Sequence, residues 1–345
     1  MNFFLKIFKV FPPEFAHSIS LNSLNFLFRT NLIGIFNKKI DNHNEFTLFG
    51  MKFKNKLGTA AGLDKNGDYI DALGSLGFGF LEVGTVTPLP QFGNPKPRVF
   101  RNYRENSIIN RLGFNNKGVE YLVKNLQKRQ YEGIVGVNIG ANKSSTGDKR
   151  INDYLTCIEK VHSLVDYITI NISSPNTPDL RNFHIKDNLE SLITSVEHKI
   201  KELDFKKPIF LKISPDETDE TIEMIVDLVN NSSITGLIAT NTTICKENIS
   251  NEKLKNEDGG LSGQPLMDKS TNKISMIRSK CSDIPIIGVG GVMSKDDYLL
   301  KINAGADLVQ IYTGFIIKGP DLINQIIRDS VWESFVLILA ILSLV

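Results

Sequence analysis

Asparagines recur where apolar runs of this 345-residue chain end or are flanked by loops, at Asn110, Asn171, Asn176 and Asn241. An amide side chain offers both a donor and an acceptor, so together they can pair with the alternating C=O and N–H groups of a cyclic imide. A lone asparagine more often caps a turn, but four in such positions favour a binding site. Few carboxylates and no histidine accompany them. That scarcity disfavours a metal hydrolase or an aldolase-type acid–base pair.

Two lysines and a set of glycines extend this chemistry. Lys65 supplies a cation for a carboxylate, whereas Lys212 lies in an apolar run, where an ammonium is costly to bury without a negative partner. A reduced, negatively charged cofactor is such a partner. Glycines at 290–291 let backbone N–H groups approach an anion, and Gly263 adds another. Tight turns alone also use glycine, but the Tyr-Thr-Gly run at 312–314 tips the balance to a phosphate site.

Short apolar runs alternate with helical patterns from residue 57 onward, which predicts an α/β fold of the (β/α)8 barrel type. A doubly wound sheet is the alternative, disfavoured because no G-x-G-x-x-G follows the first run. A barrel gathers the carboxyl ends of its strands on one face, where the polar residues would meet. A hairpin at 46–53 would plug the opposite end, and helices are expected at 188–203 and 219–230. The predicted strands are 57–62, 80–86, 134–140, 167–173, 208–213, 236–241, 285–292 and 308–313.

Composition and charge restrict the class of protein. With 41% hydrophobic and 23% charged residues, the chain is globular rather than disordered, collagenous or coiled-coil. The net charge of +2 argues against nucleic acid as the main partner. Three widely separated cysteines exclude a disulfide scaffold or zinc ribbon, and five histidines show no metal-ligand spacing. We therefore expect no metal site.

The N-terminal segment differs from the rest in charge, since residues 1–60 carry a net +5 and the remainder −3. Residues 1–11 form an amphipathic helical pattern, and a second helix is expected from Pro13 to about Arg29. The segment resembles no signal peptide and is too interrupted to span a bilayer. Its aromatic and basic residues are typical of an interfacial membrane anchor. A helical hairpin packed on its own domain is the alternative.

Long ordered motifs over roughly residues 1–328 resemble the dihydroorotate dehydrogenases. They are A-A-G-L-D-K-N-G (60–67), E-V-G-T-V-T-P-x-P-Q (82–91), G-N-P-x-P-R-x-F-R (93–101), N-R-L-G-F-N-N (110–116), N-I-S-S-P-N-T-P-x-L-R (171–181), G-V-G-G (288–291) and I-Y-T-G-F-I-x-K-G-P (311–320). The resemblance implies an FMN enzyme that oxidises (S)-dihydroorotate to orotate in de novo pyrimidine (UMP) biosynthesis. The C5 proton goes to a base and the C6 hydride to the flavin. Ser174 stands where the soluble branch has cysteine and the membrane-associated, quinone-reducing branch has serine.

The resemblance also implies roles for individual residues, with Ser174 as the catalytic base. Substrate contacts are expected from Lys65, Asn110, Arg111, Leu112, Gly113, Phe114, Asn171, Asn176, Asn241 and Thr242. FMN contacts are expected from Ala61, Gly62, Leu63, Asp64, Lys65, Thr85, Asn138, Asn171, Lys212, Thr240, Gly263, Gly291, Tyr312 and Thr313. His17 and Arg101 resemble the polar pair of a quinone tunnel, although a surface histidine is the plain alternative for His17. The loop 174–184 would act as a lid that excludes water.

Three segments are therefore expected: a helical membrane-associating and quinone-tunnel segment at 1–36, an FMN-binding barrel at 45–330, and an atypical apolar tail at 331–345. The implied partners are dihydroorotate and orotate, ubiquinone or menaquinone, and the cytoplasmic side of the inner membrane, bound peripherally. A soluble enzyme that uses fumarate or NAD is one alternative, disfavoured by Ser174 and residues 1–30. A flavin- or phosphate-binding protein without turnover is another, disfavoured because every catalytic position is filled.

Overall fold

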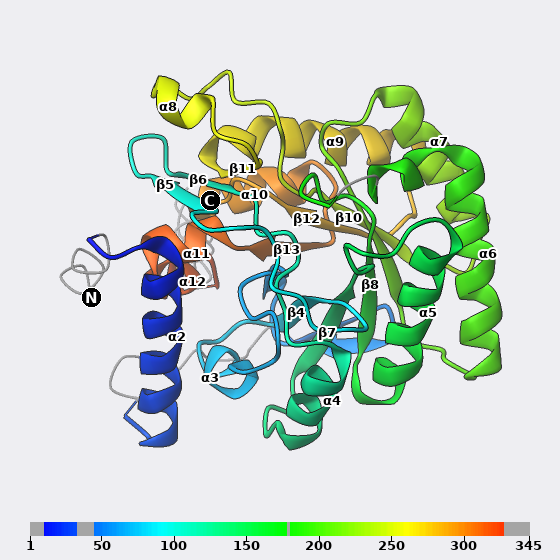
Figure 1. Ribbon diagram of the computed structural model, residues 1–345, viewed down its shortest axis with the longest axis horizontal. Coiled ribbons are helices and arrows are strands. Elements are labelled where there is room, and N and C mark those ends of the chain that lie inside the picture. Colours follow the sequence, from blue (N-terminus) through cyan, green and yellow to red (C-terminus); the bar gives the residue numbers. More distant parts are fainter. Residues whose placement is uncertain (1–9, 33–44, 178–179, 328–345) are drawn as a thin grey trace, which may run out of the picture.

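A closed barrel of parallel strands forms the centre of the computed structural model, which describes residues 10–32, 45–177 and 180–327 (Figure 1). The strand order around the barrel is β10-β12-β13-β3-β4-β7-β8-β9. Each barrel strand falls inside one of the predicted ranges, so the (β/α)8 barrel is confirmed and the doubly wound sheet is excluded. The strands are β3 (Leu57–Thr59), β4 (Phe80–Val86), β7 (Ile134–Ile139), β8 (Tyr167–Asn171), β9 (Ile209–Ile213), β10 (Gly236–Ala239), β12 (Ile286–Val289) and β13 (Leu308–Ile311).

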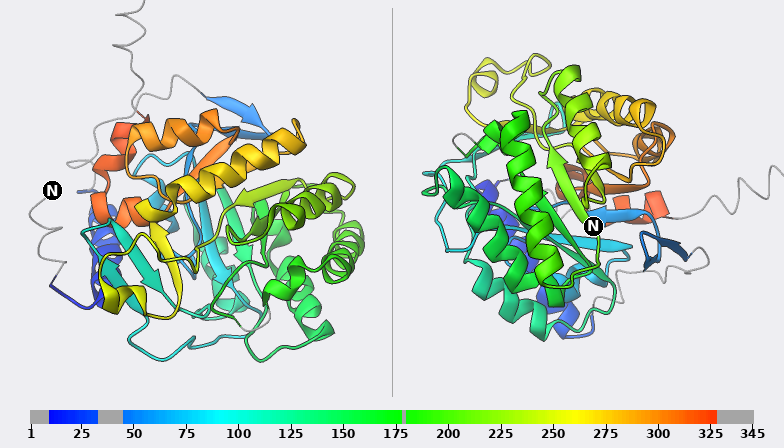
Figure 2. Two further views of the ribbon diagram at one scale, coloured as in Figure 1. Left: turned by 90° about the horizontal axis from the view of Figure 1, so that it is seen from above. Right: turned by 90° about the vertical axis from the view of Figure 1, so that its right-hand side faces the viewer.

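Helices pack around the barrel, as the alternating pattern predicts. The predicted helix 219–230 is α7 (Asp219–Asn230), capped by the Thr218 hydroxyl, which accepts from the Thr221 N–H at 3.3 Å. The predicted helix 188–203 is α6 (Lys186–Glu202), which lies beside α5 (Asp148–Val161) and α7 on one flank (Figure 2). Among the described residues, no helix is long and apolar enough to cross a membrane. Further helices around the barrel are α3 (Ile70–Gly74), α4 (Val119–Lys128), α8 (Glu252–Lys255), α9 (Met267–Lys280), α10 (Lys295–Asn303), α11 (Thr313–Lys318) and α12 (Asp321–Ile327). Short 3-10 helices are η2 (His162–Leu164), η3 (Leu180–His184) and η4 (Gln264–Leu266).

A hairpin of β1 (Phe46–Leu48) and β2 (Met51–Phe53) closes the amino-terminal end of the barrel. The Phe53 ring packs edge-on against Phe80, with 5.7 Å between centroids, and Phe49 packs in the same way against Phe210 at 5.6 Å. Phe80 and Phe210 lie at the amino ends of their strands. The predicted plug is therefore confirmed, and it leaves the opposite end of the barrel for a ligand.

The helix predicted after the Pro-Pro pair is α2 (Pro13–Arg29), which stands on the flank of the barrel beside α3 (Figure 1). Ala16 and Leu21 are buried against the barrel, while Phe15 and Phe26 remain 52% and 63% exposed. Most of the helix predicted over residues 1–11 lies outside the described residues, as does the apolar tail at 331–345. The membrane and tail assignments for these segments stay predictions.

A three-stranded antiparallel sheet beside the barrel was not predicted. Its order is β11-β6-β5, from β11 (Gly260–Gly263), β6 (Ser107–Asn110) and β5 (Val99–Asn102). The register pairs Gly260 with Asn110 and Gly263 with Ser107, so residues about 150 positions apart meet. A turn of polar residues between two short β-prone runs marks the β5–β6 hairpin in the sequence. The run Gly-Leu-Ser-Gly of β11 instead resembles a turn, and only its pairing makes it a strand.

Candidate active site

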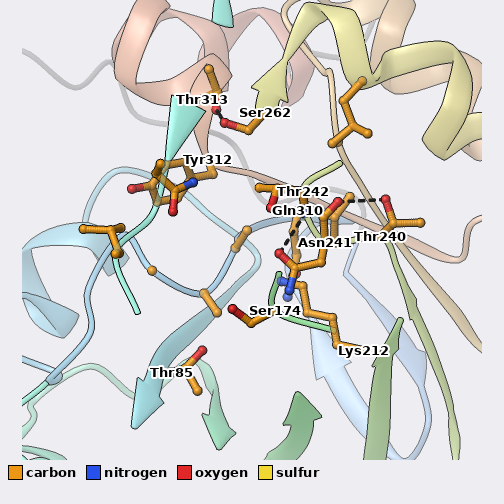
Figure 3. A pocket seen from close by; sticks show the side chains of 18 of the residues that line it. Thr85, Ser174, Lys212, Thr240, Asn241, Thr242, Ser262, Gln310, Tyr312 and Thr313 are labelled. Atoms are coloured by element: carbon orange, nitrogen blue, oxygen red, sulfur yellow. Dashed lines mark hydrogen bonds between the residues drawn. The ribbon is translucent and has the colours of Figure 1, made fainter. Parts of the chain in front are cut away.

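A cavity opens at the carboxyl ends of the barrel strands, lined by both polar and apolar side chains, as is typical of a small-molecule or cofactor site. Figure 3 shows Ser262 and Thr313 toward one end of the cavity and Ser174 and Thr85 toward the other. Most predicted site residues meet there: Ala61, Gly62, Lys65, Thr85, Asn110, Leu112, Gly113, Phe114, Asn171, Ser174, Asn176, Lys212, Thr240, Asn241, Thr242, Gly263, Gly291, Tyr312 and Thr313. Their clustering follows the prediction, while their individual roles stay predictions.

The asparagines converge on this cavity from separate segments of the chain. Asn241 Nδ2 donates to Ser173 Oγ at 3.0 Å, and Asn176 Nδ2 donates to the Asn110 carbonyl at 3.2 Å. Asn171 Nδ2 donates to Thr85 Oγ1 at 3.2 Å. The side-chain amide of Asn110 makes no hydrogen bond within the described part of the chain and is available to a ligand. Neighbouring polar groups thus hold several amides in defined orientations before a ligand arrives.

Glycines shape the end of the cavity beside Thr313. Gly291 has φ +84°, and an added Cβ would lie 2.4 Å from Met267 Cα, which no side chain could tolerate. Gly263 has φ +98°, and its Cβ would lie 2.2 Å from the Asn106 carbonyl oxygen. Thr313 Oγ1 donates to Ser262 Oγ at 2.8 Å nearby. Only glycine therefore fits at these two positions of the cavity wall, and the phosphate site at this end stays a prediction.

Lys212 lies on β9, buried and lining the cavity. Burial lowers the pKa of its ammonium, and the charge of Glu82 only partly opposes this. Glu82, deeper in the barrel, accepts from Gln310 Nε2 at 2.7 Å, Asn138 Nδ2 at 2.9 Å and the Tyr167 hydroxyl at 3.0 Å. Lys212 forms no ion pair with any described residue, so its charge is open to a ligand.

Ser174 follows β8 and is buried in the cavity wall. Its Oγ accepts from the Asn176 backbone N–H at 3.3 Å. Among the residues that the structure describes, no histidine or carboxylate is hydrogen-bonded to this oxygen. Any activation of Ser174 as a base therefore comes from its surroundings or from water.

Arg111, Leu63, Asp64 and Asn138 do not line this cavity. The Arg111 guanidinium pairs with Glu257 at 2.8 Å and lies over the Phe100 ring, and these contacts hold it away from the cavity. Asp64 accepts from the backbone N–H groups of Asp68 and Tyr69, at 3.0 and 2.8 Å, and so shapes the loop after Lys65. Burial, the largest effect, raises the Asp64 pKa to about 6.

Asn138 lies behind Thr85 and Asn171, and its side-chain oxygen accepts hydrogen bonds from their side chains at 2.6 and 3.1 Å. Leu63 belongs to the hydrophobic core.

A second cavity, largely apolar, lies between α2 and the barrel. His17 and Arg101 both line it, and their role in a quinone tunnel stays a prediction. Lys65, Leu112 and Tyr312 line both cavities, so these side chains form a common wall. The two spaces are therefore adjacent, and one is bounded by the N-terminal helix.

The electrostatics of this second cavity depend on a few charges. His17 is half-buried, and burial together with the nearby Lys65 charge lowers its pKa to about 4, so it is neutral at pH 7. Burial also lowers the Lys65 pKa, to about 8, against the opposing charge of Glu14. Arg101 donates to the Phe11 carbonyl and lies over the Tyr103 ring. Within the described part of the chain, Lys65 is thus a cation placed between the two cavities.

Sequence reasoning did not single out Ser262 and Gln310, which also line the first cavity. Gln310 is a polar residue inside the apolar run of β13, and that mismatch was a usable signal. Ser262 sits between glycines in an unrecognised strand and carried no clear signal. The fold and cavity together define a class, a (β/α)8 barrel with its ligand site at the carboxyl ends of the strands.

Comparison with known proteins narrows that class. The chain matches the dihydroorotate dehydrogenase family over residues 44–331. A dihydroorotate dehydrogenase (quinone) of Saccharophagus degradans is 48% identical, covering 92% of this chain and 95% of that protein. One from Legionella pneumophila strain Corby is 46% identical, covering 91% and 94%. The crystal structure of DHODH from Eimeria tenella in complex with ferulenol has a TM-score of 0.83 at 34% identity, covering 91% and 89%. The chain belongs to the dihydroorotate dehydrogenase family.

Proposed function

We propose that this protein oxidises (S)-dihydroorotate to orotate with FMN as hydride acceptor and a membrane quinone as final acceptor, in de novo pyrimidine (UMP) biosynthesis. The observation that carries the proposal is the pair of adjoining cavities with Lys65, Leu112 and Tyr312 in their common wall. Adjoining spaces suit a reaction whose reductant and oxidant bind separately. The relatives named dihydroorotate dehydrogenase (quinone) support the same pair of substrates.

The residues present fit FMN. Gly263 and Gly291 line the end of the cavity where a phosphate would lie against the backbone, and the buried Lys212 ammonium has no ion-pair partner among the described residues, which a negatively charged ring system would supply. When bound, FMN supplies the hydride acceptor that no amino-acid side chain offers. The polar residues Thr85, Asn171, Thr240 and Thr313 would orient it, and Asn138 would act through Thr85 and Asn171.

Dihydroorotate would bind among the amides beside Ser174. Its ring N–H and C=O groups match the donors and acceptors of Asn110, Asn171, Asn176 and Asn241. Lys65 would pair with the carboxylate, because its lowered pKa of about 8 still leaves it mainly protonated at pH 7. Ser174 Oγ would take the proton from C5. The loop 174–184, part of which lies outside the described residues, would exclude water from the site.

The second cavity would receive ubiquinone or menaquinone, with His17 and Arg101 as polar contacts near its carbonyl groups. The neutral His17 ring offers one N–H donor and one acceptor nitrogen, while the Arg101 guanidinium offers donors only. We assign residues 1–36 to this tunnel and to peripheral membrane contact on the cytoplasmic side of the inner membrane. The exposed Phe15 and Phe26, with the basic excess of residues 1–60, support that placement.

The test is a visible absorbance spectrum of the detergent-purified protein, followed anaerobically. Dihydroorotate should bleach a flavin band, and a soluble ubiquinone analogue should restore it. Bleaching without recovery would retain the substrate and contradict the quinone. A protein with no flavin band would contradict the proposal as a whole.

A further inference from the structure

Lys301 on α10 is a buried lysine that the proposed chemistry does not use. Its side chain is 0% exposed. Nζ donates to Ser270 Oγ at 2.7 Å and to Thr271 Oγ1 at 3.1 Å, both on α9. Neither hydroxyl is an anion, and Lys301 makes no ion pair with any residue in the described ranges. Burying an ammonium that is hydrogen-bonded only to hydroxyls costs free energy, so a negative charge nearby would stabilise the charged form of Lys301.

Among the described residues, the carboxylates that act on Lys301 lie beyond ion-pair distance. Burial lowers its pKa to about 7, although Asp297 on α10 and Asp268 on α9 both act to raise it. The Asp297 carboxylate is already engaged, because it accepts from the Met293 backbone N–H at 2.8 Å. A further anion close to Lys301 would hold the ammonium in its charged form.

Ser270 connects Lys301 to the glycines that follow β12. Its Oγ lies 3.1 Å from the Gly290 carbonyl, to which it can donate. An added Cβ on Gly290 would lie 2.8 Å from Ser270 Oγ, and one on Gly288 would lie 3.4 Å from Lys301 Cδ. Neither Lys301 nor Ser270 lines the cavity. Lys301 thus packs directly behind the backbone that forms the glycine end of the site.

We propose that Lys301 is a positioning residue for the cofactor phosphate, whose buried ammonium, held through Ser270 behind Gly290 and Gly291, makes the site select a phosphorylated flavin over the unphosphorylated one. The inference rests on the proposed function, since it takes FMN as the cofactor. A phosphate at the glycine end supplies the anion that Lys301 lacks. Attraction between groups shielded from water is weakly screened, so the ammonium acts without touching the ligand.

The experiment compares FMN with riboflavin, which has the same ring system but no phosphate. The full-length protein is freed of flavin, and each ligand is titrated back while quenching of flavin fluorescence is followed. Lys301→Met should raise the Kd for FMN by roughly tenfold or more while changing the Kd for riboflavin by less than about twofold. Lys273→Met is the matched control, because Lys273 is a mostly buried lysine on α9 that pairs with Asp219 at 2.8 Å. It should leave both constants unchanged.

Equal weakening of both ligands would show that Lys301 serves packing alone, and an unchanged FMN Kd would show no role at the phosphate; either result overturns the inference. Lys301→Gln keeps a hydrogen-bonding group near Ser270 and carries the same expectation, so it decides the matter if Lys301→Met does not fold. A wild-type protein that fails to bind FMN would instead refute the proposed function, and the inference with it.

Discussion

Glu14 holds α2 on Arg98, in the loop that precedes β5, and removing its charge should loosen the helix. Its carboxylate accepts from Arg98 Nε at 3.1 Å and from Arg98 Nη2 at 2.8 Å. The side chains are 27% and 7% exposed, so the pair is largely shielded from water. Arg98 Nη1 also donates to the Phe92 and Asn94 carbonyls, at 2.6 and 2.9 Å. Arg98 should therefore stay in place in a Glu14→Gln variant.

The size of the effect follows from the bonds lost. Hydrogen bonds to charged groups contribute about 1.5–3 kcal/mol, and the glutamine amide keeps the shape and one acceptor of the carboxylate. Glu14→Gln should therefore weaken the docking of α2 by about 1–2 kcal/mol, which is roughly a five- to thirtyfold change in the docking equilibrium.

Limited proteolysis of the full-length protein measures this equilibrium, because cleavage within α2 tracks the population of the undocked helix. The variant should be cleaved faster by the same factor, and kcat/KM for a ubiquinone analogue should fall. Reduction of the flavin should keep its wild-type limiting rate at saturating dihydroorotate, while the concentration of dihydroorotate that it needs should rise, because loss of the Glu14 charge lowers the Lys65 pKa further. Glu45→Gln is the control, since the Glu45–Lys52 pair in the hairpin is exposed and should contribute little. Unchanged cleavage of α2, or an equal loss in both half-reactions, would refute the reasoning.

The pH dependence of α2 cleavage is an independent test of the Glu14–Arg98 pair. Burial acts to raise the Glu14 pKa, but the hydrogen bond and charge of Arg98, with Lys96 and Lys65, bring it below its ordinary value of 4.5. A lowered acid pKa stabilises the docked state above 4.5, and this stabilisation is lost as the pH falls through the folded-state value. Cleavage of α2 should accelerate over that range in the wild type, and less in Glu14→Gln.

Three further predictions follow from the site. Ser174→Ala should retain FMN but slow flavin reduction by dihydroorotate about 10²–10⁴-fold in stopped flow; an unchanged rate would remove Ser174 as the base. Gly291→Ala should weaken FMN binding in a fluorescence titration, because its Cβ would lie 2.4 Å from Met267 Cα. Gly50→Ala changes a glycine with a similar φ but open space around it, so it should leave FMN binding unchanged. Equal effects of the two substitutions would argue against a phosphate site at Gly291. Deleting residues 1–30 should spare flavin reduction yet cripple quinone turnover and vesicle binding, and wild-type quinone rates in the truncated protein would defeat the tunnel.

The barrel and many of the residues at the carboxyl ends of its strands could be predicted from the sequence. Buried parallel strands need continuous apolar runs, and such runs recur with helical patterns between them, so the eight barrel strands were predicted close to the bounds that the structure shows. Because parallel barrel strands run in one direction, the residues at and after their carboxyl ends lie on one face of the barrel. Ser174, Asn171 and Asn241 could therefore be grouped before any contact was known. The hairpin plug and α2 could also be predicted, because the apolar pattern of the hairpin and the Pro-Pro pair before α2 are local features of the sequence.

The direction of individual side chains, and the segments that close the site, depend on long-range packing that the sequence pattern does not reveal. Arg111 belongs to a motif that lines the cavity, yet its own side chain is drawn to Glu257 and Phe100, and Asn138 supports its neighbours from behind. The β5–β6–β11 sheet pairs segments far apart in sequence, so no local pattern could reveal β11. The wall shared by the two cavities and the position of Lys301 behind the glycines likewise arise from long-range packing. Local periodicity specifies each element and its buried face, whereas the direction of a side chain depends on neighbours that only folding brings together.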